Sequence, residues 1–249
     1  MTNSQIKKIR QLHQKKFREE FKLFIAEGPK IVNELLNSDF RLNSIFYTKE
    51  FELNKLKVKG EIISEKEMEQ ISTLTTPNQM LAVFEIPEQG EISFSSKEIL
   101  LALDDIRDPG NFGTIVRIAD WFGMKKIVCS ENCVHVYNSK VVQATMGSIA
   151  RVKVFYQDLE TFFKEKVASS ELKIYAATMD GKNIYRENFS DGGVILIGNE
   201  SNGISKNLLQ YCSNQITIPR LGQAESLNAA IATAIICSEF TRRQYNISH

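Results

Sequence analysis

Three separated segments of the chain repeat one pattern: a strand end, then a loop rich in glycine and asparagine, then a helix start. They span residues 104–123, 196–205 and 216–234. Parallel strands of one sheet end at the same edge, and α/β proteins bind their ligands at that edge. We therefore expect the three loops to meet and to bring five polar residues within reach of one another: Asn111, Arg117, Glu200, Ser226 and Asn228.

The second part of the chain alternates apolar runs with helical stretches. The apolar runs, rich in branched side chains, occupy 98–105, 125–130, 151–156, 173–179, 194–198 and 215–219. Near-continuous apolar strands that alternate with helices predict an α/β fold, a parallel sheet covered by helices on both faces. The last predicted helix is the longest and begins at Ser226. One stripe of it carries small and apolar residues: Leu227, Ala230, Ile231, Ala234 and Cys237 or Ser238.

The first part of the chain predicts a separate, small α/β domain. A basic, exposed helix is expected over residues 4–20, and strands over 21–28, 42–48, 61–64 and 80–86. Pro29 favours a helix start, and Ser64 with Glu67 forms a capping-box pattern. A polar, turn-rich stretch at 87–96 marks the boundary. We predict a substrate-binding domain at 1–90, a linker at 91–98 and a second domain at 99–249.

Composition limits the partners and metals of the chain. Its 249 residues carry a formal net charge of only +1, so polyanion binding would need a local patch. One basic cluster fits either a solvated helix face or a phosphate contact: Lys7, Lys8, Arg10, Lys15, Lys16, Arg18 and Lys22. Four cysteines without a CxxC pair and three scattered histidines argue against a metal site. The sequence shows no secretory signal and no membrane span, which predicts a cytoplasmic protein.

Each polar residue of the first two loops also has a simpler structural explanation. Asn111 can cap the helix that follows it. Arg117 lies between apolar neighbours and either snorkels to solvent or meets a buried anion, with Trp121 placed to stack on it. Glu200 either caps the helix starting near Ile204 or holds Arg117 in a forked ion pair.

In the third loop, Ser226 is a natural helix cap, and Asn228 would then expose its amide near the helix N-terminus. The second loop, GNESNG, lacks the pattern of a phosphate-binding P-loop and the dinucleotide fingerprint GxGxxG. A doubly wound nucleotide-binding enzyme is therefore disfavoured. Three such loops, each after a parallel strand, are not expected from helix capping alone.

Together the three segments resemble the motifs of the SpoU (TrmH-type) branch of the SPOUT RNA methyltransferases. NFGTIVRIAD, IGNESNGIS and IPRLGQAESLNAAIA occur in the order of that family and match it over about residues 99–243. The first segment supplies Asn111 and Arg117, the second Glu200, and the third Ser226 and Asn228. The front part resembles, more loosely, the substrate-binding domain that often precedes this fold.

The resemblance implies a C-terminal trefoil knot, a homodimer formed through the C-terminal domain, and transfer of a methyl group from S-adenosylmethionine to a ribose 2′-hydroxyl of RNA. Ribosomal RNA is favoured over tRNA. The implied catalytic residues are Asn111, Arg117, Glu200, Ser226 and Asn228. The implied cofactor-binding residues are Thr178, Met179, Gly198, Asn199, Ile218, Leu227 and Asn228. The alternative is a catalytically inactive RNA-binding assembly factor with the same fold.

Overall fold

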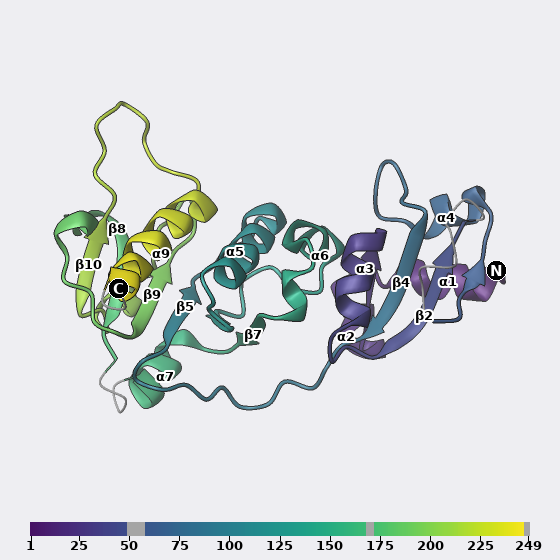
Figure 1. Cartoon of the computed structure of the whole chain (residues 1–249), viewed down its shortest axis with the longest axis horizontal. Coiled ribbons are helices and arrows are strands. Elements are labelled where there is room, and N and C mark those ends of the chain that lie inside the picture. Colours follow the sequence, from purple (N-terminus) through teal and green to yellow (C-terminus); the bar gives the residue numbers. More distant parts are fainter. Residues whose placement is uncertain (49–57, 168–171, 247–249) are drawn as a thin grey trace. The chain divides into compact units, whose positions relative to one another are not determined.

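The computed structural model describes residues 1–48, 58–167 and 172–246. By their contacts the residues form two compact units (Figure 1). Met1–Gln89 and His135–Arg151 make the first unit, and Gly90–Val134 with Val152–His249 makes the second. Among the residues described, no helix is long and apolar enough to cross a membrane.

The first unit is built on a four-stranded sheet in the order β1-β4-β2-β3. Strand β4 (Met80–Glu85) runs antiparallel to both β1 (Leu23–Glu27) and β2 (Leu42–Tyr47), whereas the short β3 (Glu61–Ile62) pairs in parallel with β2. The helices are α1 (Asn3–Gln11), α2 (Lys15–Phe21), α3 (Pro29–Leu36) and α4 (Glu65–Ile71). The predicted Pro29 start of α3 and the Ser64 capping box of α4 are both confirmed.

Helices cover both faces of this sheet. Ile9 of α1 and Met68 of α4 pack in one apolar cluster with Leu23 and Ile25 of β1. Because side chains alternate along a strand, Phe24 points to the other face, where its ring lies 4.7 Å from that of Tyr137. Such two-sided burial explains why all five residues of β1 are buried.

By its contacts the segment His135–Arg151 groups with the first unit, although the predicted boundaries place it in the second domain. Its helix α6 (Ser139–Thr145) contacts β1, and Arg151 forms an ion pair with Glu34 of α3. Together with α3, this segment covers the face of the first sheet that carries Phe24. The chain therefore returns to the first unit in the middle of the second.

The basic N-terminal helix predicted over 4–20 is two helices, α1 and α2, interrupted between Gln11 and Lys15. Arg18 contradicts the predicted exposure, because it is only 2% exposed. Its guanidinium donates to the carbonyls of Leu12 and His13, each at 2.9 Å. Arg18 thus ties the turn between the two helices together and is withdrawn from the surface.

The second unit confirms the predicted parallel sheet. Its six strands lie in the order β10-β8-β9-β5-β6-β7, and every neighbouring pair is parallel. They span β5 (Ile99–Leu103), β6 (Lys126–Cys129), β7 (Lys153–Tyr156), β8 (Ile174–Asn183), β9 (Gly193–Ile197) and β10 (Asn214–Thr217). The central strands β5 and β9 are almost wholly buried, as their continuous apolar runs predict.

Among the described residues, the α-helices that accompany this sheet are α5 (Pro109–Trp121), α7 (Leu159–Phe162), α8 (Lys206–Leu209) and α9 (Ala229–Asn246). A π-helical turn, Phe163–Val167, extends α7. The sequence predicts a helical stretch over 158–168, of which position 168 lies outside the described residues. The residues of the stripe predicted on α9 are partly buried and partly exposed. Ala230 and Cys237 are buried, but Ile231 is 54% exposed. The buried side of α9 instead continues through Thr233 and Phe240.

Candidate functional site

The candidate site lies at the carboxyl edge of the parallel sheet, where β5, β9 and β10 each end in one of the predicted loops. The first loop leads from β5 into α5. Asp108 is the N-cap of α5, because its carboxylate accepts the Asn111 backbone N–H at 2.7 Å. The predicted capping role of Asn111 is therefore wrong. Asn111 lies in the first turn of the helix, and its side-chain amide is available for other partners.

The second loop folds back on itself directly after β9. Asn199 and Gly203 exchange two backbone hydrogen bonds, at 3.0 and 2.9 Å. A Cβ added at Gly198 would lie 2.4 Å from the backbone of Gly203, so only glycine fits this close approach. The Asn199 side-chain oxygen accepts the backbone N–H groups of Ser201 and Asn202. The loop is thus fixed by its own polar groups.

The third loop joins β10 to α9 and projects away from the sheet in Figure 1. Asn228 caps α9, since its side-chain oxygen accepts the N–H groups of Ala230 at 2.9 Å and Ile231 at 3.2 Å. Ser226 was predicted to be the cap and is not; it is exposed in the loop, before the helix begins. The start of α9 is displaced accordingly to Ala229.

Two side-chain hydrogen bonds join the three loops. Asn228 donates its amide to the Asn111 side-chain oxygen at 2.7 Å, and Asn111 donates its own amide to Glu200 at 2.5 Å. Residues more than eighty positions apart are therefore linked in one chain, Asn228–Asn111–Glu200. We call this chain the amide relay. The expected convergence is confirmed for these three residues.

Arg117 and Ser226 stay outside the relay. Arg117 is exposed on α5, and within the described residues no ion pair joins it to Glu200. Of the two structures foreseen for Arg117, the side chain that reaches solvent is the one observed. Neither expected role of Glu200 is seen: it holds Asn111, and α8 begins only after Ser205. Trp121 is 84% exposed, which leaves the predicted stacking on Arg117 without support.

The predicted cofactor-binding residues lie within β8 (Thr178 and Met179), directly after β9 and β10 (Gly198, Asn199 and Ile218), and just before α9 (Leu227 and Asn228). Thr178 carries a buried hydroxyl that has no hydrogen-bond partner among the described residues. Met179 is 55% exposed, so it is not a core residue, and its carbonyl accepts from Thr217 at 3.1 Å. Ile218 is half-buried and Leu227 is 46% exposed. An orphan hydroxyl beside a tight glycine loop and exposed apolar groups fits a bound molecule with polar and apolar parts.

The sequence did not assign a role to the acidic pair that ends β5. Asp104 is buried and accepts the Ser205 N–H at 2.8 Å. Asp105 has a positive φ of 57°, binds Arg107 at 2.6 Å, and accepts the Asn199 amide at its carbonyl at 2.8 Å. The Asp105 carboxylate also raises the pKa of Arg107. These hydrogen bonds and the ion pair hold the first two loops together. In the sequence, two adjacent acidic residues at the end of a predicted strand were the feature that could have indicated this role.

Comparisons with known proteins agree with this geometry. The model of the SpoU rRNA methylase family matches residues 98–238, and that of the MRM3-like substrate binding domain matches residues 3–82. A 23S rRNA (guanosine(2553)-2′-O)-methyltransferase of Bacillus subtilis is 29% identical over 94% of each chain.

Solved structures match over the whole chain as well. A TrmH-family protein from Porphyromonas gingivalis is 34% identical with a TM-score of 0.88, covering 98% of this chain and 99% of its own. An AdoMet-bound rRNA methyltransferase from Sinorhizobium meliloti is 29% identical with a TM-score of 0.83, over 98% and 96% of the two chains.

Proposed function

Because the chain belongs to the SpoU rRNA methylase family, we propose that it methylates a ribose 2′-hydroxyl of ribosomal RNA with S-adenosylmethionine as the methyl donor. The observation that supports this proposal most directly is the amide relay. It joins the family's three motif segments at one edge of the sheet through Asn228, Asn111 and Glu200. The site is expected to work in the cytoplasm.

S-adenosylmethionine supplies a sulfonium-bound methyl group that a nucleophile can accept. The residues that hold it are proposed to be those of the predicted set on β8, β9 and β10. Gly198 lets the backbone approach closely, and the Thr178 hydroxyl offers the unpaired polar group. Ile218 and Leu227 add apolar surface. Asn199 fixes the loop that carries Gly198 and is proposed to act through that loop.

Arg117 is proposed to act on the RNA. A guanidinium has a pKa above about 12 and is a poor base, so we favour a clamp on the phosphate next to the reacting ribose. From there the positive charge stabilises the alkoxide that develops as the 2′-hydroxyl loses its proton. Direct proton acceptance by Arg117 is the second mechanism. Arg117 is exposed, and Glu200 is hydrogen-bonded to Asn111 instead. The Arg117 guanidinium is therefore accessible to an RNA phosphate.

The amide relay is proposed to hold the three loops of the site in fixed positions relative to one another. Asn111 and Asn228 present fixed amides beside the methyl donor, and Glu200 orients Asn111. Alignment of donor and acceptor contributes on the order of 7–11 kcal/mol in well-oriented reactions, so a fixed frame is worth much of the rate. Ser226, exposed next to the relay, is proposed to complete the wall of the site when RNA is bound.

A homodimer and a trefoil knot complete the proposal. Three large apolar side chains are exposed on or beside α5 and α9, which contact each other: Trp121, Leu227 and Ile231. Exposed apolar groups on adjacent helices favour a protein interface. The knot is inferred from the similarity in fold to the TrmH-family protein. Ile231→Lys is expected to yield monomers in light-scattering measurements, and unchanged dimers would refute this interface.

The function is tested by transfer of a tritium-labelled methyl group to ribosomal RNA and tRNA purified from cells that lack this gene. We expect incorporation into ribosomal RNA and loss of it in Arg117→Ala, with cofactor affinity within a few-fold of wild type. Arg186→Ala, which removes an exposed arginine elsewhere in the second unit, is the matched control. Full activity of Arg117→Ala would refute the proposed role. Absence of transfer by the wild type would instead support the inactive assembly factor.

A further inference from the structure

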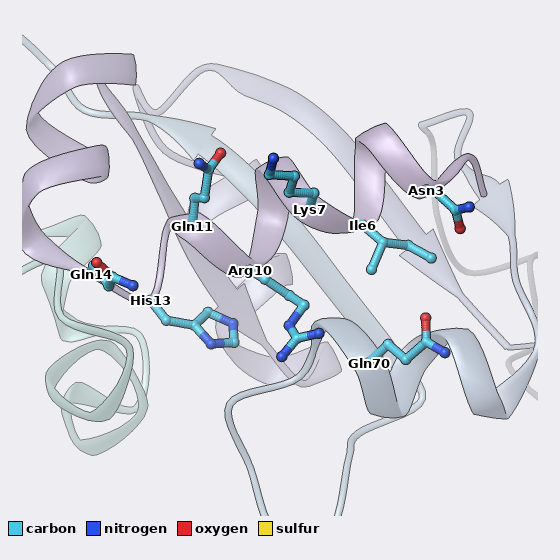
Figure 2. Close-up of a pocket in the computed structure, with 8 residues that line it drawn as sticks. All are labelled: Asn3, Ile6, Lys7, Arg10, Gln11, His13, Gln14 and Gln70. Carbon is cyan, nitrogen blue, oxygen red and sulfur yellow. The ribbon is translucent and has the colours of Figure 1, made fainter.

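A shallow groove lies on the first unit, between α1 and α4 and far in sequence from the candidate site. Figure 2 shows its lining residues, with Arg10 and Ile6 of α1 pointing towards Gln70 of α4, and with Lys7 and Gln11 on the neighbouring side of α1. Its volume is about 630 Å³. Two cations and four carboxamides dominate the lining, and Ile6 is its single aliphatic residue.

We propose that this groove binds the sugar–phosphate backbone of a double-helical RNA segment. The proposal rests on the proposed function, because it assumes that the substrate is RNA. It adds the place on the first unit where the substrate is held and the residues that hold it. No carboxylate is among the lining residues, which suits a polyanion.

The charge of the groove is available for a ligand. Lys7 and Arg10 are exposed, and neither has a carboxylate partner among the described residues. The acids at the same end of α1 are occupied, since the Met1 amino group lies 2.6 Å from Glu67 and 3.5 Å from Glu61. Hydrogen bonds from that amino group and from Ser64 lower the pKa of Glu67 to about 2.

Three other members of the basic N-terminal cluster are already engaged. Arg18 is buried in the turn, Lys15 lies 3.7 Å from Glu19, and Lys8 lies over the ring of Phe21. The two cations in the groove are therefore the part of the cluster best placed for phosphates. The sequence left open whether the cluster is a solvated face or a phosphate contact, and in the groove this question concerns Lys7 and Arg10.

The carboxamides indicate RNA rather than a small molecule. Asn3, Gln11, Gln14 and Gln70 each offer a donor and an acceptor, which match the 2′-hydroxyl groups and base edges in the shallow groove of an RNA helix. Small-molecule pockets are mostly apolar, and this lining is not. The groove is lined by no Phe, Tyr or Trp, and its one aromatic ring, that of His13, is held at the Ile71 carbonyl, so the lining offers little for stacking on unpaired bases.

The groove is held in a fixed shape, as a recognition surface requires. Ile9 and Leu12 anchor α1 in the apolar cluster beneath it. His13 donates from Nε2 to the Ile71 carbonyl at 3.1 Å and so ties the end of α1 to the end of α4. Thr2 and Gln5 form a capping box at the other end of α1. Because α1 and α4 are already fixed, RNA binding should cost little conformational entropy in the backbone of the groove.

The test measures binding of a short fluorescent RNA duplex, and of a DNA duplex of the same sequence, to the full chain. For Lys7→Ala/Arg10→Ala we expect Kd for the RNA duplex to rise about tenfold and the slope of log K against log salt to fall by about two. Lys30→Ala is the matched control, because Lys30 is exposed on α3, on the opposite face of the sheet. Gln70→Glu, which puts a carboxylate in the groove, should weaken binding as well.

Each outcome decides the proposal. Unchanged RNA binding by both groove variants would overturn it, and so would equal losses in the groove variant and in Lys30→Ala, or equal affinity for RNA and DNA duplexes. Thermal unfolding of each variant checks that the fold is intact, and Gln70→Glu serves as the second probe. Methyl transfer by the wild type is measured separately, so that failure of the groove and failure of the proposed function are told apart.

Discussion

The amide relay gives the sharpest prediction about the site. In Asn111→Ala the second unit loses a hydrogen bond to the Glu200 carboxylate and another to the Asn228 amide. Hydrogen bonds to charged groups contribute about 1.5–3 kcal/mol and neutral ones about 0.5–1.5 kcal/mol. Because Asn228 is exposed and the other two residues are only half-buried, we take the lower ends and expect a loss of about 2 kcal/mol.

A loss of this size lowers the unfolding temperature by about 4–8 °C for a unit of this length. The same change frees the ends of three loops, and a shift of about 1 Å at a reacting centre costs about a hundredfold in rate. We therefore expect kcat for methyl transfer to fall about a hundredfold. Near-UV circular dichroism follows unfolding, and transfer of a labelled methyl group follows the rate.

The matched control is Asn202→Ala, which removes an exposed amide from the same loop as Glu200. It is expected to leave both quantities unchanged. A double-mutant cycle with Asn228→Ala isolates the pair, with an expected coupling of about 0.5–1.5 kcal/mol. Wild-type melting of Asn111→Ala, together with zero coupling, would show that the relay does not hold the loops.

Three further changes test the cofactor cradle and the first unit. Thr178→Val should leave the melting temperature unchanged or raised, because it removes an unpaired buried hydroxyl, while calorimetry shows weaker S-adenosylmethionine binding; unchanged affinity would exclude Thr178 from the cradle. Gly198→Ala should abolish that binding, since its Cβ would lie 2.4 Å from the opposing backbone, whereas Gly222→Ala has open space and should bind normally. Burial and Arg18 lower the pKa of His135 from 6.5 to about 4, so the unfolded chain takes up a proton first and stability falls as the pH drops from about 6.5 to 4. Denaturant titrations should show a smaller fall in His135→Gln, and an equal fall would assign the effect to other groups.

The strand ends were predictable because their apolar runs are long and unambiguous. The runs before Asp104 and Gly198 are buried on both faces, and a parallel sheet must then bring their loops to one edge. The helix caps were harder to predict. Asp108 followed by Pro109 was a usable signal, because proline favours the first helical position and leaves the cap to the residue before it.

The start of α9 could not be predicted from local sequence, as Ser226 and Asn228 show. Serine and asparagine are about equally good caps, so the residues alone could not decide between them. The contact with Asn111 favours Asn228, and that contact spans 117 positions. The placement of α6 had the same difficulty: its apolar side fits either unit, and only the surface around Phe24 determines which unit it covers.

Helix geometry separates Arg117 from the relay within one copy of the chain. Arg117 follows Asn111 by six positions on α5, which turns its side chain about 120° away from that of Asn111. In the proposed homodimer, the guanidinium would then serve the cradle of the partner copy. Mixing the inactive variants Arg117→Ala and Gly198→Ala tests this, because a mixed dimer would keep one complete site and random pairing would restore about a quarter of the wild-type activity. No recovery after exchange of subunits would mean that each copy uses its own Arg117.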